Sequence, residues 1–432
     1  MRIAIVTFGS QGDVYPYLAL GKGLQAAGHD VLLVTHALFE TLIRSRGLDF
    51  AAVELNPRDV LDSEAGQNWL DTGNNSLRFF WQLARIAGPI LQQTMLDCWK
   101  ACQGVEAMLF APLAIYTAQA VAEKLGVPFA VVSYQPLTPT RAFASPFFPP
   151  APIWLPFAGG AYNRLTHVLS LQAFWHLLRP LVNKARQKTL NLPPLPPHWL
   201  QSLIQQQDRP ILYGYSPTVV PTAPDWGHWN QVTGYWFLDR PDDWQPPANL
   251  LDFLATGPPP VYIGFGSMNN RDPQEVTEVV LKALARSKRR GILLTGWGGI
   301  SRADLPDEVF VIDKIPLDWL FPHTAAVVHH GGAGTTLTGL RAGVPSVIIP
   351  FFGDQPFWGQ RVFELGVGPR MIPRKRLSAE RLAAAIEVAT SDEGMRTRAK
   401  AVGERIRGED GVRKAVAVFE RYIGGEGIWG SR

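Results

Sequence analysis

The stretch AVVHHGGAGTTLTGLRAGVPSVIIPFFGDQPFWGQRV, residues 326–362, is the most informative part of this 432-residue chain. Its pattern predicts an apolar strand over 325–328, then a histidine pair and a glycine-rich turn, a helix from near Thr335, and a strand over 346–349. Glycines let backbone N–H groups approach a phosphate, and a helix N-terminus adds partial positive charge. We therefore expect this turn to bind a diphosphate.

Asp354 and Gln355 follow the second strand of the same stretch. They fall at the carboxyl ends of the strands, where parallel α/β sheets bind their ligands. Two carboxylate oxygens and an amide suit adjacent hydroxyls on a hexose. A diphosphate site with hydroxyl-binding groups beside it indicates a nucleotide-sugar site.

Alternating strand and helix patterns extend outward from this stretch over most of the chain. They predict two series of parallel strands with helices on both faces, hence an α/β fold. The first series covers residues 1–225 and the second covers 261–408. Residues 226–260, rich in Trp, Pro and Asp, are predicted to link the two, and residues 409–432 to form an amphipathic C-terminal helix.

The composition limits the possible partners and location. A net charge of +4 argues against a dedicated nucleic-acid binder but permits a weakly basic surface facing anionic lipid. Cys98 and Cys102 have no neighbours that complete a metal site, so we expect buried, reduced thiols in a cytoplasmic protein. We find no signal-peptide pattern and no apolar run of about 18 residues that spans a membrane.

Asp13 is the candidate catalytic residue in the first turn, FGSQGDVYP. Taken alone, the position has two readings. Asp13 either caps a helix that begins near Val14 or Tyr15, which aspartate does well, or acts in catalysis.

Several motifs together resemble one family. HHGGAGTT followed by PFFGDQPFWGQRV closely resembles the donor signature of the UDP-glycosyltransferases, in their sterol glucosyltransferase branch, which is related to antibiotic glycosyltransferases. The resemblance extends, in the family's order, to GSQGDVYP, QPLTPTRAF at 135–143, VYIGFGSM at 261–268, TGWGG at 295–299 and DWLFP at 318–322. It implies the GT-B fold, two Rossmann-like domains facing a cleft, with the C-terminal helix crossing back onto the first domain.

The resemblance also assigns donor residues. It places the diphosphate at Ser267, His330, Gly332, Ala333, Gly334 and Thr335, the sugar at Asp354 and Gln355, and the nucleobase at Trp297 and Ile315. Plant relatives carry a ribose-binding glutamate where this chain has Thr338, so the ribose contact is unassigned.

For the acceptor side, the resemblance makes Asp13 the base, in place of the histidine of the plant branch. An ordinary aspartate, with a pKa of about 3.9, is a poor base, and burial beneath an apolar acceptor would improve it. Whether Asp13 acts alone or with a histidine such as His36 is open at this point.

An aromatic and proline-rich stretch over 134–160 precedes a basic helix over 162–188. We expect these segments to wall the acceptor pocket, with ordinary interdomain packing as the alternative. The pocket residues predicted here are Phe143, Phe148, Trp154 and Phe157.

The resulting prediction is an inverting UDP-glycosyltransferase that moves a hexose, expected to be glucose, to a hydroxyl of a sterol-like or other lipophilic acceptor. The chain has no Asp-x-Asp tripeptide, so we expect transfer without a metal or other cofactor. Transient contact with the inner face of a membrane would supply the acceptor. The alternatives are a polyketide or glycolipid acceptor, a nucleotide-sugar isomerase, and a non-catalytic lipid- or nucleotide-binding protein.

Overall fold

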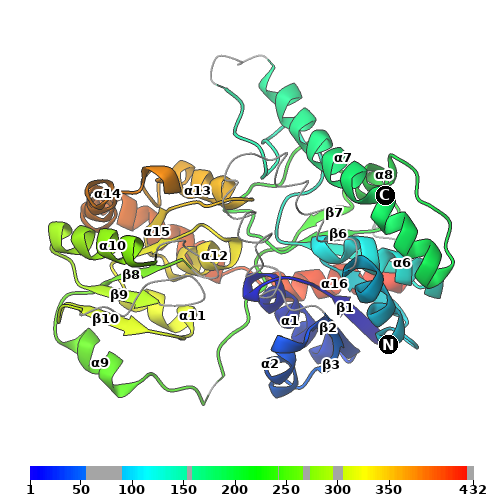
Figure 1. The fold of residues 1–432 in the computed structure, drawn as a ribbon, viewed down its shortest axis with the longest axis horizontal. Coiled ribbons are helices and arrows are strands. Elements are labelled where there is room, and N and C mark those ends of the chain that lie inside the picture. The colour runs from blue at the N-terminus through cyan, green and yellow to red at the C-terminus, as the bar shows by residue number, and fades with distance from the viewer. Residues whose placement is uncertain (55–89, 153–157, 242, 266–272, 295–304, 426–432) are drawn as a thin grey trace. The chain divides into compact units, whose positions relative to one another are not determined.

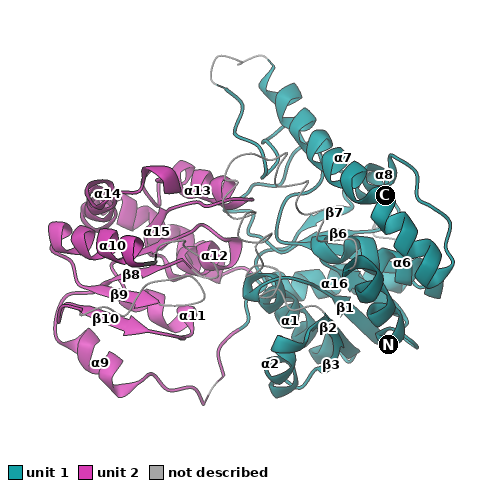
Figure 2. Cartoon of the chain, viewed as in Figure 1, with its two compact units in different colours: residues 1–238, 410–432 teal, residues 239–409 magenta. Residues whose placement is uncertain are grey.

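The computed structural model describes residues 1–54, 90–152, 158–241, 243–265, 273–294 and 305–425 (Figure 1). The chain divides into two compact units, coloured separately in Figure 2. Unit 1 comprises residues 1–238 and 410–432, and unit 2 comprises residues 239–409. Each unit is built around one parallel sheet, so the predicted α/β class is confirmed.

Unit 1 contains a seven-stranded parallel sheet in the order β3-β2-β1-β4-β5-β6-β7. Its strands read as continuous apolar runs because both faces are covered: Ile3 to Val6 in β1 and all of β4 and β5 are buried. The strands are β1 (Arg2–Val6), β2 (Asp30–His36), β3 (Asp49–Val53), β4 (Ala107–Phe110), β5 (Phe129–Ser133), β6 (Ile211–Tyr213) and β7 (Asn230–Val232).

The helices of unit 1 follow these strands. Those with both ends described are α1 (Gln11–Ala26), α2 (Glu40–Ser45), α6 (Ile115–Leu125), α7 (Gly159–Ala185), α8 (Trp199–Gln205) and α16 (Gly411–Ile423), and residues 90–101 are helical as well. Short 3-10 turns, η1 (Ala37–Phe39) and η2 (Pro112–Ala114), follow β2 and β4, and one π-helical turn, η3 (Arg186–Leu190), continues α7. Within the described ranges, no helix has the length and apolar character needed to cross a membrane.

Helix α16 returns the chain to unit 1 and packs against α1. Val416 and Phe419 are buried in the same core as Leu20 and Leu24 of α1. The close approach depends on Gly23, because a Cβ at that position would overlap the side chain of Val412. The predicted crossing of the C-terminal helix back to the first domain is confirmed.

Unit 2 contains a five-stranded parallel sheet in the order β10-β9-β8-β11-β12. The strands are β8 (Val261–Gly264), β9 (Gly291–Leu294), β10 (Val309–Ile312), β11 (Ala326–His329) and β12 (Ser346–Ile348). The helices and 3-10 turns are α9 (Ala248–Ala255), α10 (Pro273–Ser287), α11 (Leu317–Leu320), η4 (Phe321–His323), α12 (Ala333–Ala342), α13 (Gln355–Glu364), η5 (Arg374–Arg376), α14 (Ala379–Ser391) and α15 (Glu393–Arg407). One core lies under α10 and α14, and a second lies under α9 and α11.

The segment predicted as a linker, residues 226–260, is instead divided between the units. Strand β7 completes the sheet of unit 1, and α9 buries Leu250 in a core of unit 2. The boundary falls after Leu238. The aromatic residues that suggested a linker are packing residues: Trp236 is buried, with its ring edge-on to Tyr17 at 6.0 Å between ring centroids.

Candidate active site

Asp13 lies in the first turn of α1, directly after the turn that follows β1. Helix α1 begins at Gln11, and Ser10 occupies its N-cap position, so the reading of Asp13 as the N-cap residue is wrong. Asp13 is the third helical residue, and its Oδ2 accepts hydrogen bonds from the backbone N–H of Ser10 at 2.7 Å and the Ser10 hydroxyl at 2.9 Å. These two hydrogen bonds hold one carboxylate oxygen of Asp13 in place.

The other carboxylate oxygen is held from a different strand. Oδ1 of Asp13 accepts a hydrogen bond from the hydroxyl of Tyr134, the residue that immediately follows β5. Strands β1 and β5 flank β4, so the parallel sheet brings both turns to its carboxyl edge. The motifs did not indicate Tyr134. Its position directly after a predicted strand was the available signal.

His36, the candidate helper of Asp13, supports the turn instead. Its Nε2 accepts a hydrogen bond from the backbone N–H of Gly9 at 2.9 Å, and its ring packs at 5.8 Å from the ring of Phe8. Gly9 adopts a positive φ of 125°, which favours glycine. His36 thus holds the backbone that carries Asp13, whereas Ser10 and Tyr134 contact the carboxylate.

The surroundings of Asp13 adjust its proton affinity. Burial is the largest influence and raises the pKa of Asp13 above its ordinary value. The hydrogen bonds from Tyr134 and Ser10 act in the opposite direction because they stabilise the ionised form. The net increase in pKa makes the carboxylate a stronger base than an exposed aspartate.

Two leucines are exposed on the same edge of the sheet. Leu38 in η1 is 42% exposed and Leu113 in η2 is 60% exposed. These turns follow β2 and β4, the two strands that flank β1, so they lie on either side of the turn that carries Asp13. A single exposed leucine is ordinary, but this pair gives the rim around the carboxylate an apolar character.

The predicted acceptor residues are only partly described. Phe143 packs edge-on against His167 and Trp226, at 6.0 Å from each ring centroid, so its ring belongs to the packing of this loop. Phe148 is partly buried, and Trp154 and Phe157 lie outside the described residues. Their place in an acceptor pocket stays a prediction.

In unit 2, the glycine-rich turn joins β11 to α12. Helix α12 begins at Ala333, two residues before the predicted start, with Gly332 at the N-cap position. Residues 332–335 are partly exposed, and the first N–H groups of a helix have no intrahelical partner. The hydroxyls of Thr336 and Thr338 donate to the carbonyls of Gly332 and Gly334, which leaves the partly exposed Thr335 as the hydroxyl suited to a ligand.

His330 lies over this helix N-terminus. A Cβ at Gly332 would overlap the imidazole Nε2 of His330, so glycine is required there. The Nδ1 atom of His330 is buried and has no hydrogen-bond partner among the described residues. Burial lowers the pKa of His330 to about 4, so the ring is neutral at neutral pH. Its neighbour His329 is fully buried, and its Nδ1 accepts from the N–H of Gly331 at 3.0 Å.

The predicted sugar-binding pair lies beside the same turn. Gly331 has a positive φ of 86°, and a Cβ there would meet the side chain of Ile348 and the carbonyl oxygen of Gln355. The side chain of Gln355 is buried, and its Oε1 accepts from the N–H groups of Phe351 at 2.7 Å and Phe352 at 3.2 Å. The structure thus brings the histidine turn and the loop of Asp354 together.

These contacts give Asp354 and Gln355 different surroundings. The side-chain oxygen of Gln355 shapes the loop, and sugar binding by the two residues stays a prediction. The carboxylate of Asp354 also accepts a hydrogen bond from the indole N–H of Trp358 at 2.8 Å, which orients it. This use of the Gln355 oxygen was not predicted from the sequence.

The remaining donor residues are described in part. Ser267 and Trp297 lie outside the described residues. Ile315 lies between β10 and α11, partly buried against the core that contains Leu250 and Leu320.

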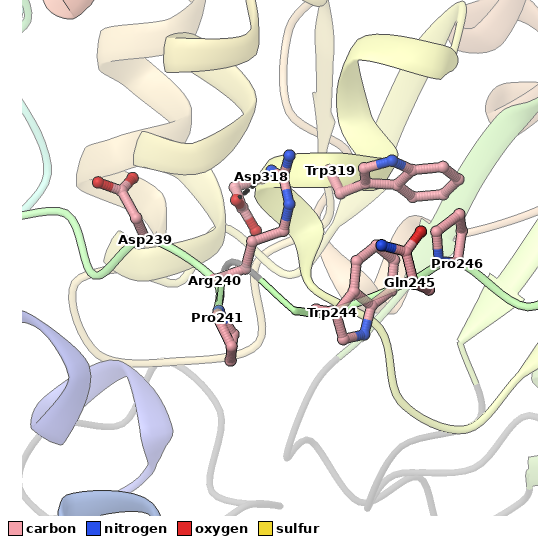
Figure 3. Close-up of a pocket in the computed structure, with 8 residues that line it drawn as sticks. All are labelled: Asp239, Arg240, Pro241, Trp244, Gln245, Pro246, Asp318 and Trp319. Carbon is pink, nitrogen blue, oxygen red and sulfur yellow. Dashed lines mark hydrogen bonds and ion pairs between the residues drawn. The ribbon is translucent and has the colours of Figure 1, made fainter. Parts of the chain in front are cut away.

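A separate pocket of unit 2, with a volume of about 550 Å³, lies between residues 239–246 and α11 (Figure 3). Arg240 pairs with Asp318 at 2.9 Å, and the rings of Trp244 and Trp319 lie 5.3 Å apart. Among the described residues, none that we predicted to bind donor or acceptor lines this pocket.

Comparison with known proteins connects both units to glycosyl transfer. The family model "Glycosyltransferase family 28 N-terminal domain" matches residues 3–144, and "Erythromycin biosynthesis protein CIII-like, C-terminal domain" matches residues 295–410. The chain is 37% identical to a sterol 3-beta-glucosyltransferase of Arabidopsis thaliana, over 98% of this chain and 68% of the relative. It is 38% identical to that of Cryptococcus neoformans, over 98% of this chain but 27% of the relative, so it spans about a quarter of that fungal protein.

Solved structures share the architecture. The glycotransferase of kitacinnamycin superimposes with a TM-score of 0.72 at 20% identity, covering 98% of this chain and 99% of that one. The calicheamicin glycosyltransferase CalG4 gives a TM-score of 0.67 at 19% identity, covering 98% of both chains. The predicted GT-B fold is confirmed.

Proposed function

Because the chain belongs to the glycosyltransferase family that includes the sterol 3-beta-glucosyltransferases, we propose that it transfers a hexose from a nucleotide sugar to the hydroxyl of a lipophilic acceptor. The observation that carries the proposal is the setting of Asp13. Its carboxylate is fixed by Ser10 and Tyr134, its pKa is raised, and apolar turns flank it.

In this proposal Asp13 is the general base. Its carboxylate accepts the proton of the acceptor hydroxyl while that oxygen forms a bond to the anomeric carbon of the sugar. The bond from the anomeric carbon to the diphosphate oxygen breaks, and the configuration at that carbon inverts. Tyr134 and Ser10 keep the carboxylate in one orientation, which lowers the cost of reaching the transition state.

The donor side stabilises the leaving diphosphate. The N–H groups at the start of α12 and the Thr335 hydroxyl suit its oxygens, as does Nδ1 of His330, which has no hydrogen-bond partner among the described residues. Since these groups stabilise the negative charge of the departing diphosphate, we expect transfer without a metal ion. Addition of EDTA should leave the rate intact, and a loss that Mg²⁺ or Mn²⁺ restores would contradict this account.

The proposed donor is UDP-glucose. The oriented carboxylate of Asp354 supports binding of sugar hydroxyls, and the family resemblance suggests Gln355 as a second sugar contact and Ile315 as a contact of the nucleobase. A structure of the related Streptomyces glycosyltransferase SsfS6 was solved with thymidine diphosphate, so thymidine sugars are the natural comparison in a donor screen.

The proposed acceptor is a sterol or a similar flat polycyclic alcohol. The exposed Leu38 and Leu113 beside Asp13 support an apolar acceptor, as does the identity with sterol 3-beta-glucosyltransferases. Because such an acceptor lies in lipid, we propose transient contact with a membrane. The free cysteines Cys98 and Cys102 are compatible with the cytoplasmic face.

Incubation with UDP-glucose and a sterol, followed by mass spectrometry, tests the proposal directly. A hexosylated sterol is the expected product, and Asp13→Asn should lower turnover by about 10²-fold or more while UDP binding persists. Near-normal turnover of Asp13→Asn would remove Asp13 from the mechanism. Product with polyketide alcohols and none with sterols would favour a secondary-metabolite acceptor instead.

A further inference from the structure

The first half of helix α7 has an inverted pattern of burial. Its side chains Thr166, His167 and Ser170 are buried together with Leu171, whereas Leu165 and Leu169 are 54% and 46% exposed. In Figure 1 this half of α7 reaches beyond the sheet of unit 1. A helix that packed only for core formation would bury its leucines and expose its polar residues.

Specific hydrogen bonds fix this orientation. Thr166 accepts from the N–H of Ser145 at 2.9 Å, and the hydroxyl of Ser170 lies 2.7 Å from that of Ser145. Nε2 of His167 lies 3.1 Å from the carbonyl oxygen of Phe143. Rotating α7 to bury its leucines would break these bonds, so the exposure is a stable property of the fold.

The exposed leucines begin a stripe along the outer side of the helix. Positions 165, 169, 173, 176, 180 and 184 share one helical face, and the exposed residues there are Leu165, Leu169, Ala173, His176, Pro180 and Lys184. Lys188, in the η3 turn that continues the helix, is exposed as well and adds positive charge beyond Lys184. The combination of an apolar stripe with cationic residues is typical of helices that lie in a lipid interface.

The surrounding sequence has an unusual charge. From Lys124 to Gln207 the chain contains no Asp or Glu, while it contains seven Lys and Arg in that stretch. The net charge of the whole chain is only +4, so positive charge is concentrated here. Of the seven, Arg186 is buried and paired with Glu123 at 3.0 Å. The other basic residues have no acidic neighbour within this stretch of sequence.

We propose that the outer face of α7, formed by Leu165, Leu169, Ala173 and Lys184 and continued by Lys188 of η3, docks on a bilayer that contains anionic lipid. Leucine side chains enter the apolar boundary, and the basic residues meet lipid phosphates and carboxylates. The inference rests on the proposed function in one respect: docking would give access to a lipophilic acceptor held in the membrane.

Vesicle co-sedimentation of the full chain tests this surface. The protein should bind phosphatidylcholine vesicles that contain phosphatidylserine, bind pure phosphatidylcholine less, and release as salt is raised. The double variant Leu165→Gln/Leu169→Gln should lower the partition coefficient by at least about tenfold, because half-exposed leucines lose their apolar contact. Each of Lys184→Gln and Lys188→Gln should lower the partition coefficient about fivefold.

Leu251→Gln is the matched control, since Leu251 is 45% exposed on α9 of unit 2 and should leave vesicle binding unchanged. Wild-type vesicle binding by the leucine double variant would overturn the proposal. So would a dimer in sedimentation equilibrium that the double variant dissociates, with no vesicle binding, because the face would then bind a second copy.

Activity separates this inference from the proposed function. With sterol delivered in cyclodextrin, the leucine double variant should transfer glucose at the wild-type rate, and with sterol in anionic vesicles it should be slower. Equal loss in both assays would overturn docking as the role of these leucines. Vesicle binding without any sugar transfer would contradict the proposed function and leave the docking surface in place.

Discussion

At the scale of single residues, Asp13 and Tyr134 form a pair whose effect on acidity has a definite sign. The hydrogen bond from Tyr134 lowers the Asp13 pKa and so opposes burial. Tyr134→Phe removes that bond, and the pKa of Asp13 should rise. Because the base must be deprotonated, the acid limb of the kcat/KM profile should move to higher pH. For every pH unit that the limb moves, kcat/KM measured on the acid side should fall about tenfold.

Tyr17→Phe is the control for this profile. Tyr17 lies one helical turn after Asp13, and its hydroxyl donates to the carbonyl of Val132 at 3.2 Å rather than to the carboxylate. The acid limb of the kcat/KM profile of Tyr17→Phe should stay close to that of the wild type. A Tyr134→Phe profile that is unchanged, or displaced to lower pH, would show that the hydroxyl does not act on Asp13.

Gly9 offers a second residue-scale test, because it touches the same carboxylate. A Cβ at Gly9 would overlap the side chain of Asp13, whereas a Cβ at Gly28 would meet nothing within 4 Å. Both glycines have positive φ, so each alanine should cost about 1–2 kcal/mol of unfolding free energy through strain. Only Gly9→Ala should also lose activity, by about 10²-fold, because it displaces Asp13. Equal activity losses in both variants would point to strain alone.

At the scale of elements, the turn between β11 and α12 couples the diphosphate and sugar groups. Gly331→Ala combines strain at a positive φ with overlap against Ile348 and the Gln355 carbonyl. It should cost about 1–2 kcal/mol for strain and a further 1–3 kcal/mol for overpacking. The affinity for UDP, measured by calorimetry, should fall together with the free energy of unfolding.

The control for this turn is Gly353→Ala. Gly353 has a φ of 66° and nothing within 4 Å of a Cβ, so only strain applies. Thermal unfolding should rank Gly331→Ala below Gly353→Ala. If the two variants unfold at the same temperature and bind UDP equally, the proposed coupling of turn and loop fails.

The elements also show what the sequence can predict. Strand–helix alternation predicted both parallel sheets, because apolar periodicity is a local signal. The start of α1 was predicted three or four residues too late, since Gln11, Gly12 and Asp13 carry no apolar periodicity. Tyr134 was missed because its contact with Asp13 joins positions 121 residues apart. The burial of Trp236 is equally non-local. The sequence therefore did not show that this part of the predicted linker belongs to unit 1.

At the scale of the whole molecule, the last helix belongs to the first unit. Phe419 is 1% exposed in the core of unit 1, so Phe419→Ala should cost about 3–5 kcal/mol of unfolding free energy. UDP binding by unit 2 should persist under native conditions. Arg421→Ala, an exposed change on the same helix, should stay within about 0.5 kcal/mol of the wild type. If Phe419→Ala lost UDP binding at temperatures where unit 1 is folded, the assignment of α16 to unit 1 and of UDP binding to unit 2 would be contradicted.

The return of α16 to unit 1 also sets an order of events during synthesis. Unit 2 is one continuous stretch of chain, residues 239–409, whereas unit 1 is interrupted by it. The ribosome therefore releases all of unit 2 before it makes the helix that covers α1. Domains fold as units during translation, usually the N-terminal one first, but here the unit that begins the chain finishes second. Until α16 emerges, the face of α1 around Gly23 stays uncovered, and a nascent chain stalled at this stage would be a natural client for chaperones.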